Sequence, residues 1–277
     1  MSDPKSLLLH LDASPRLGQR LEIAAQLART FDADVTALYA VSSFYPGYPF
    51  AAPSSAEAVA ALRDIEAANR AAVKATFDAA VQGRAERMRW AAVDFAAERT
   101  FARQARYADL MILGQHEPGR QAQADLPPDF VQWVLIESGR PGLVIPYVGA
   151  PARFGRVAVV AWKNTREAAH AVGASLALLR RCERVHVVAW DEADELEDGG
   201  PLDIEEYLRL QGVACTMHRN MSRPDAVGEA LLSLVADTSA DLLVMGCYGH
   251  SRAREWVLGG VTRSVLQAMT VPVLMSH

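Results

Sequence analysis

The chain has 277 residues, of which 51% are apolar, and its formal net charge at pH 7 is -5. This mildly negative balance offers no basic surface for general nucleic-acid binding, and no apolar run approaches the roughly 20 residues of a membrane span. The three cysteines, Cys182, Cys215 and Cys247, are too few and too widely spaced for a disulfide framework or a zinc site, so we expect a cytoplasmic protein with reduced thiols.

Continuous apolar segments alternate with amphipathic segments along the chain, which is typical of parallel sheets covered by helices on both faces. In the first half, strands are predicted at residues 6–11, 34–40, 87–92, 109–113 and 142–146, and helices at 17–31, 56–81, 94–106 and 129–138. In the second half, strands are predicted at 156–161, 184–190, 213–218, 241–245 and 272–276, and helices at 166–181, 202–211, 224–237 and 260–269. The predicted fold class is therefore α/β, with doubly wound parallel sheets.

The two halves of the chain repeat one another. The matching segments are 6–14 with 157–165, and 108–114 with 240–246. Gly149-Ala150-Pro151 lies between the repeats, and each half is close to the common size of a domain. We therefore predict two domains, at residues 1–149 and 152–277.

A glycine-marked loop follows the predicted strand at 241–245. Gly246 and Gly249 permit positive φ and a close approach of the backbone, and Gly259-Gly260 stands where the next helix begins. Backbone N–H groups exposed in this way suit an anion such as phosphate. The spacing fits neither the dinucleotide motif G-x-G-x-x-G nor the P-loop, which requires a Gly-Lys-Ser/Thr run.

This spacing resembles the ATP-binding signature of universal stress proteins, and Val271-Pro272-Val273-Leu274 resembles the last strand of that family. The resemblance covers nearly the whole chain. It implies two Rossmann-like domains of the adenine nucleotide alpha hydrolase-like type, paired about a pseudo-two-fold axis as an intramolecular dimer, and it leaves a further homodimer open. In the family the last strands meet across that axis, which assigns residues 143–146 and 271–275 to this place.

The resemblance also implies a function, which is adenine-nucleotide binding in the stress response, more regulatory than catalytic. ATP would bind in the second domain, with magnesium entering only with the phosphates, and the protein partners stay unnamed. The residues assigned to the nucleotide are Gly246, Gly249, His250, Gly259, Gly260, Val261, Thr262 and Lys163.

Two of these positions depart from the family pattern. Thr262 offers a hydroxyl two residues after Gly260, whereas the family normally has Ser or Thr directly after the glycine motif. Lys163 stands where the family has an aspartate that helps to position adenine. Its positive charge would favour phosphate, and the alternative that Lys163 points to solvent is left open.

The first domain lacks the glycine pattern. Glu117 replaces the second glycine, and Pro128 and Asp129 align with Gly259 and Gly260. Proline has no N–H and the carboxylates repel an anion, so we predict that this domain does not hold a triphosphate. Asp12 does keep the acidic residue that the resemblance associates with adenine.

The sequence predicts neither catalytic residues nor metal ligands. Ser251 lies in a Gly-His-Ser-Arg-Ala segment, which lacks the second glycine of the hydrolase elbow G-x-S-x-G. Two alternatives stay open, namely a slow ATPase in which His250 or Ser251 orients water, and a nucleotide-free interaction protein. Asn164 and Thr165 are predicted to cap the helix that follows.

Overall fold

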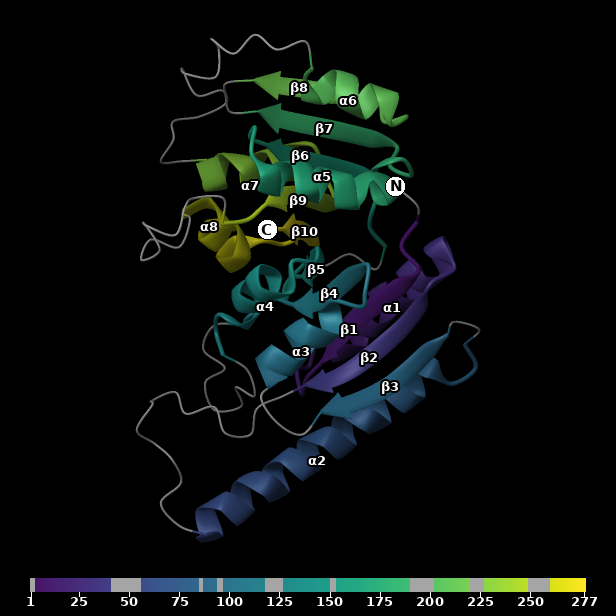
Figure 1. Ribbon diagram of the computed structural model, residues 1–277, viewed down its shortest axis with the longest axis vertical. Helices are drawn as coiled ribbons and strands as arrows, with labels where there is room; N and C mark the ends of the chain where they lie inside the picture. Colours follow the sequence, from purple (N-terminus) through teal and green to yellow (C-terminus); the bar gives the residue numbers. More distant parts are fainter. Residues whose placement is uncertain are drawn as a thin grey trace. The chain divides into compact units, whose positions relative to one another are not determined.

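The computed structural model describes residues 3–40, 56–84, 87–93, 97–117, 127–149, 153–189, 202–219, 227–248 and 260–277. The chain forms two compact units, an N-terminal unit at Pro4–Arg140 and a C-terminal unit at Pro141–His277 that also includes Asp3. Figure 1 shows that each unit combines a sheet of mainly parallel strands with helices. The predicted α/β fold class is therefore confirmed.

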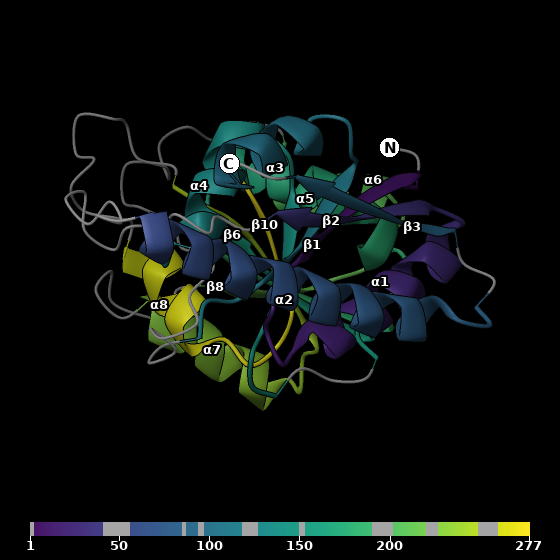
Figure 2. The same cartoon turned by 90° about the horizontal axis from the view of Figure 1, so that it is seen from below.

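The N-terminal unit contains four parallel strands in the order β3-β2-β1-β4. Its helices form two pairs, α1 with α2 and α3 with α4, which lie on opposite faces of this sheet (Figure 2). The elements are β1 (Ser6–Leu11), α1 (Leu17–Phe31), β2 (Asp34–Ala40), α2 (Ala56–Val81), β3 (Met88–Val93), α3 (Ala97–Ala105), β4 (Leu110–Gly114) and α4 (Phe130–Ser138).

The C-terminal unit has the strand order β5-β10-β9-β6-β7-β8. All neighbours are parallel except β5 and β10, which run antiparallel with Leu143 opposite Leu274. Residues 143–146 and 271–275, which were predicted to meet, therefore lie in paired strands. The elements are β5 (Gly142–Ile145), β6 (Val157–Trp162), α5 (Arg166–Leu179), β7 (Arg184–Ala189), α6 (Ile204–Leu210), β8 (Thr216–Arg219), α7 (Val227–Asp237), β9 (Leu242–Gly246), α8 (Gly260–Ala268) and β10 (Val273–Ser276).

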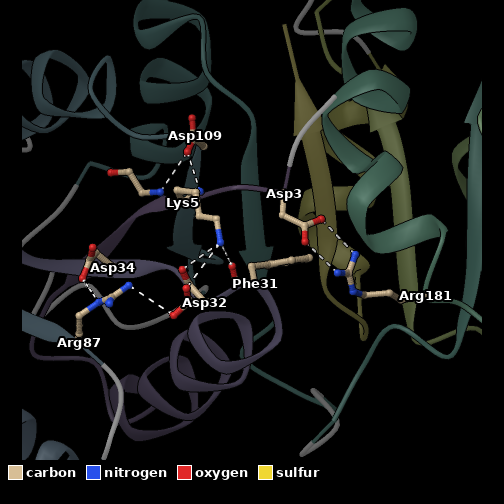
Figure 3. Close-up of polar contacts among 9 residues, drawn as sticks. Asp3, Lys5, Phe31, Asp32, Asp34, Arg87, Asp109 and Arg181 are labelled. Atoms are coloured by element: carbon tan, nitrogen blue, oxygen red, sulfur yellow. Dashed lines mark hydrogen bonds and ion pairs between the residues drawn. The ribbon is translucent and has the colours of Figure 1, made fainter.

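The compact units and the sequence repeats do not share a boundary. The repeats meet near residues 149–152, whereas the compact units divide after Arg140. β5 belongs to the C-terminal unit because its backbone pairs with β10. Asp3 belongs there as well, since its carboxylate accepts hydrogen bonds from both Nη atoms of Arg181, at 3.2 and 2.9 Å (Figure 3).

Among the boundaries predicted within the described residues, the start of β8 differs most from the sequence prediction. A strand was predicted at 213–218, but the strand begins at Thr216. The N–H of Val213 donates to the carbonyl of Leu208 at 2.9 Å and so closes the turn after α6. Val213 is buried, which explains why its apolar side chain resembles a strand residue in the sequence although its backbone does not join the sheet.

One carboxylate in each repeat fixes the start of the first strand. Asp109 accepts hydrogen bonds from the backbone N–H groups of Lys5 at 2.8 Å and Ser6 at 3.0 Å (Figure 3). Asp241 accepts from the N–H groups of Arg156 and Val157, each at 3.0 Å. The repeated Ala-Asp-Leu sequence therefore has a structural role, because it satisfies backbone donors at the amino ends of β1 and β6.

Candidate functional site

Asp12 and Arg20 form a buried ion pair at the carboxyl end of the N-terminal sheet. Asp12 directly follows β1, and Arg20 lies in the first turns of α1. Arg20 donates from Nη1 to Oδ2 of Asp12 at 3.0 Å and from Nη2 to Oδ1. The Arg20 side chain is only 2% exposed. A bidentate pair in this setting has a fixed geometry, and the carboxylate that resembled an adenine contact is already bound by the chain itself.

The same guanidinium covers Gly114, the last residue of β4. A Cβ added at Gly114 would collide with Nη1 of Arg20 and would lie 3.4 Å from its Cδ. Gly114 is the counterpart of Gly246 in the repeat, so this glycine position is filled from within the N-terminal unit. Pro128 and Asp129 lie directly before α4, as the alignment of the repeats predicted.

His10 lies beside the ion pair. Its Nε2 lies 2.9 Å from the carbonyl oxygen of Ala40, which assigns the ring proton to Nε2. Its Nδ1 faces Oδ2 of Asp12 at 3.8 Å. The rings of Phe101 and Phe130 pack against the imidazole, with centroids 5.1 and 4.6 Å away.

These surroundings set the charges of the cluster. Burial, opposed in part by the charge of Asp12, lowers the pKa of His10 to about 4. Burial by itself would raise the pKa of Asp12, but the charge and hydrogen bonds of Arg20 outweigh it and lower that pKa to about 2. At neutral pH the cluster therefore contains a neutral imidazole and a compensated ion pair, with no charge left for an added ligand.

The corresponding edge of the C-terminal unit carries different residues. Ala161 of β6 lies opposite Met245 of β9, so Lys163 and Gly246 leave neighbouring strands at the same edge. Lys163 is half-buried. The position that matches Arg20 in the repeat is Ala171, which has no group that could cover the glycine.

Gly246 is required by helix packing. A Cβ added there would lie 2.6 Å from the backbone nitrogen of Ala168 and 2.7 Å from the carbonyl carbon of Glu167. The amino end of α5 thus lies directly over the end of β9. Thr165 caps this helix as predicted, since its side-chain oxygen accepts from the N–H of Ala168 at 3.4 Å.

The first residues after β9 are held by the sheet. The N–H of Cys247 donates to the carbonyl of Ser276 at 2.9 Å, and the carbonyl of Cys247 accepts from Nδ1 of His277 at 3.1 Å. Burial, reinforced by the charge of Glu167, raises the pKa of the Cys247 thiol to about 12. Cys247 therefore fills space, in agreement with the sequence interpretation, and its backbone N–H is already used.

Tyr248 turns the chain out of the sheet with φ of 60°, in the left-handed region. A bulky side chain at positive φ is unusual and costs roughly 1–3 kcal/mol, and such residues are concentrated at functional sites. Gly249, His250 and Gly259, which the sequence assigned to the nucleotide, lie outside the described residues.

The amino end of α8 is open at its first residue. A Cβ added at Gly260 would meet no atom of the described chain within 4 Å. Val261 is half-buried, whereas Thr262 is only 4% exposed. The backbone of Gly260 is therefore exposed, and Thr262 is buried, while its assignment to the nucleotide stays a prediction.

The described residues contain no cluster of three or more His, Cys, Asp and Glu side chains that could hold a metal ion. Across the same parts of the chain, no helix has the length and apolar character needed to cross a bilayer.

Comparison with known proteins agrees with the repeat in the sequence. The pattern that defines the universal stress protein family matches residues 4–125 and again residues 155–277. The chain belongs to the universal stress protein family. Its two matches make it a tandem member, as the glycine spacing and the internal repeat predicted.

Three individual relatives of this universal stress protein show how far the likeness extends. Universal stress protein Slr1230 from Synechocystis sp. is 46% identical over 46 residues, which is 17% of this chain and 16% of that relative. A universal stress protein from Archaeoglobus fulgidus DSM 4304 is 15% identical and aligns over 99% of this chain and 96% of its own, with a TM-score of 0.70. A putative universal stress protein from Pseudomonas aeruginosa UCBPP-PA14 is 16% identical over 99% and 93% of the two chains, with a TM-score of 0.58. The two structural alignments support the assignment of the α/β fold to this chain.

The contact of Arg20 with Asp12 was not predicted from the sequence. A signal was present, because Arg20 follows Leu17 by three residues and precedes Ala24 by four, and so lies on the apolar stripe of α1. A charged residue in such a stripe needs a buried partner, and Asp12, eight positions earlier in the sequence, is that partner.

Proposed function

We propose that this universal stress protein binds one adenine nucleotide, ATP, per chain in its C-terminal repeat and acts as a regulator in the cytoplasm. The observation that carries the proposal is the asymmetry of the repeats. A side-chain ion pair of Arg20 and Asp12 closes the N-terminal edge over Gly114. In the C-terminal repeat Ala171 replaces the arginine, Gly246 is covered only by the backbone of α5, and Gly260 is exposed.

The chemistry of the open edge suits an anion. The first N–H groups of α8 have no partner within the helix, and Gly260 leaves them uncovered. Lys163 adds a positive charge at the end of β6, next to β9. The strained backbone of Tyr248 at the start of the glycine loop agrees with a functional role for this segment.

Each residue group then has a distinct role. Gly246 lets α5 approach β9, and the loop that begins there, with Gly249, His250 and Gly259, would surround the phosphates together with Gly260 and Val261. Lys163 would lie close to the phosphates, and magnesium would enter with them. Protein partners and a further homodimer stay predictions from the family resemblance.

Titration calorimetry with ATP tests the proposal. The full chain is expected to bind one ATP, and at a concentration about one hundred times the dissociation constant the ligand should add roughly 2.7 kcal/mol to the stability. Gly260→Asp should abolish binding, because a carboxylate at the amino end of α8 repels phosphate. The same carboxylate is favourable to the helix, so the fold should persist.

Asp129→Gly is the matched control in the N-terminal repeat. It removes the carboxylate that aligns with Gly260, but Arg20 still covers Gly114, so no second site should appear. Two sites in the unchanged protein, or ATP binding that survives Gly260→Asp, would contradict the proposal.

A further inference from the structure

A contact between two imidazoles joins the last two strands of the C-terminal sheet. His186 lies in β7 and His218 in β8, and Nδ1 of His186 lies 3.1 Å from Nε2 of His218. His186 is opposite Thr216 and His218 is opposite Val188, so the two rings occupy diagonal positions on one face. Their centroids are 5.2 Å apart. Among the described residues β8 pairs with β7 alone, so this contact supports an edge strand.

The surroundings of His186 determine which nitrogen donates. Its Nε2 is buried and has no hydrogen-bond partner among the described residues. A proton on that atom would be an unpaired buried N–H, which costs about 1–3 kcal/mol. The neutral ring therefore carries its proton on Nδ1 and donates to Nε2 of His218. His218 in turn carries its own proton on Nδ1 and accepts through Nε2.

A further proton is unfavourable on either ring of the folded pair. On His218 it would occupy Nε2, so that two N–H groups would face each other across 3.1 Å. On His186 it would occupy the buried Nε2, which has no acceptor. The charged groups that act on His186 are His218 on β8 and Arg184 on β7, and together with burial, which has the largest effect, they lower its pKa.

We propose that His186 and His218 form a proton-sensitive contact that holds β8 against β7 at neutral pH and releases it on acidification. The stabilisation by this contact is complete above the ordinary histidine pKa of about 6.5 and is lost as the pH falls below that value. Below pH 6.5 the unfolded chain binds protons more readily than the folded pair does. The inference is independent of nucleotide binding.

Hydrogen exchange of the full chain between pH 7.5 and pH 5.0, corrected for intrinsic rates, tests the inference. In the unchanged protein, amides at 216–219 should lose protection several-fold at the lower pH, while those of β9 should not. His218→Gln keeps an acceptor for His186 but cannot take up a proton itself, so only His186 still responds to acid and the loss of protection should be smaller than in the unchanged protein. His170→Gln, at an exposed histidine of α5, is the matched control and should behave like the unchanged protein.

Three results would overturn the inference. The first is protection of β8 that does not change with pH in the unchanged protein, and the second is an unaltered pH dependence in His218→Gln. The third is stabilisation of β8 by micromolar zinc at pH 7.5, which would identify the pair as a metal chelate. If His218→Gln does not fold, NMR titration of the unchanged protein tests the inference instead. Independent titration of both rings near pH 6.5 would contradict a hydrogen bond between His186 and His218.

Discussion

The guanidinium of Arg20 occupies the space that a side chain at Gly114 would need. One arginine thereby joins the end of β4 to Asp12 at the end of β1 and makes the carboxyl edge of the N-terminal sheet a packed core. The C-terminal repeat has an alanine at this position. Together with the exchange of Asp12 for Lys163, this difference distinguishes the carboxyl edges of the two repeats.

Breaking the Arg20–Asp12 pair should destabilise the N-terminal unit. Arg20→Met leaves Asp12 as an uncompensated buried charge, and removal of one partner from such a pair costs about 3–5 kcal/mol. The double variant Arg20→Met/Asp12→Asn should recover much of that loss, since no buried charge is left. Hydrogen exchange of peptides from β1 and β4 measures the stability of the N-terminal unit in each variant. Equal stability of the single and double variants would mean that the pair is not electrostatically coupled.

Two alanine substitutions should separate a packing glycine from an open one. Gly246→Ala should lower the free energy of unfolding by about 1–3 kcal/mol or more. The new methyl group would meet backbone atoms of α5, which cannot move aside as a flexible side chain could. The methyl group of Gly260→Ala meets no atom of the described residues within 4 Å, so its effect should be within about 0.5 kcal/mol. Chemical denaturation monitored by circular dichroism compares the two variants. Similar losses in both would show that the amino end of α8 is packed.

Acid should weaken the N-terminal unit through His10. The folded pKa of about 4 lies below the ordinary value of 6.5, so the stabilisation is complete above pH 6.5 and is lost as the pH falls towards 4. A difference of this size corresponds to about 3 kcal/mol. His10→Gln can still donate to the carbonyl of Ala40 and should flatten this part of the profile. An unchanged slope in that variant would assign the acid sensitivity to other groups.

Asp12 should add a second, more acidic loss of stability. Its folded pKa of about 2 lies below its ordinary value of 3.8, so its stabilisation is present above pH 4 and disappears as the pH falls towards 2. This loss should persist in His10→Gln and should be absent in Arg20→Met/Asp12→Asn. Exchange measured for peptides of the N-terminal unit over this range provides the test, and a profile common to all three proteins would contradict it.

Lys163 should influence which nucleotide binds. If its charge reaches the phosphates, Lys163→Asp should lower the preference for ATP over adenosine and raise the discrimination between ATP and GTP. Each change should be at most several-fold, because a partly exposed charge contributes about 1 kcal/mol or less. The preference for triphosphate should also weaken with salt, since screening acts over about 8 Å at physiological ionic strength. Lys74→Asp, on α2 of the other unit, is the control, and unchanged preferences in Lys163→Asp would place that side chain in solvent.

The sequence by itself determined the features that depend on local pattern. Alternating apolar and amphipathic segments predicted all ten strands and eight helices that the described residues contain, although boundaries such as the start of β8 moved. The internal repeat and the glycine spacing led to the family, and the residue type at position 165 predicted the cap of α5. These features are set by neighbouring residues or by a fixed period, so they can be read along the chain.

Only the tertiary structure decided how distant side chains meet. Arg20 and Gly114 are 94 positions apart, and their contact depends on how α1 is rotated against β4. The pairing of His186 with His218 depends on the register of two strands joined by a helix. The same holds for the close approach of α5 to Gly246, which the loop motif did not predict. Sequence fixes which groups are present, and packing then determines whether such a group meets a ligand or another part of the chain.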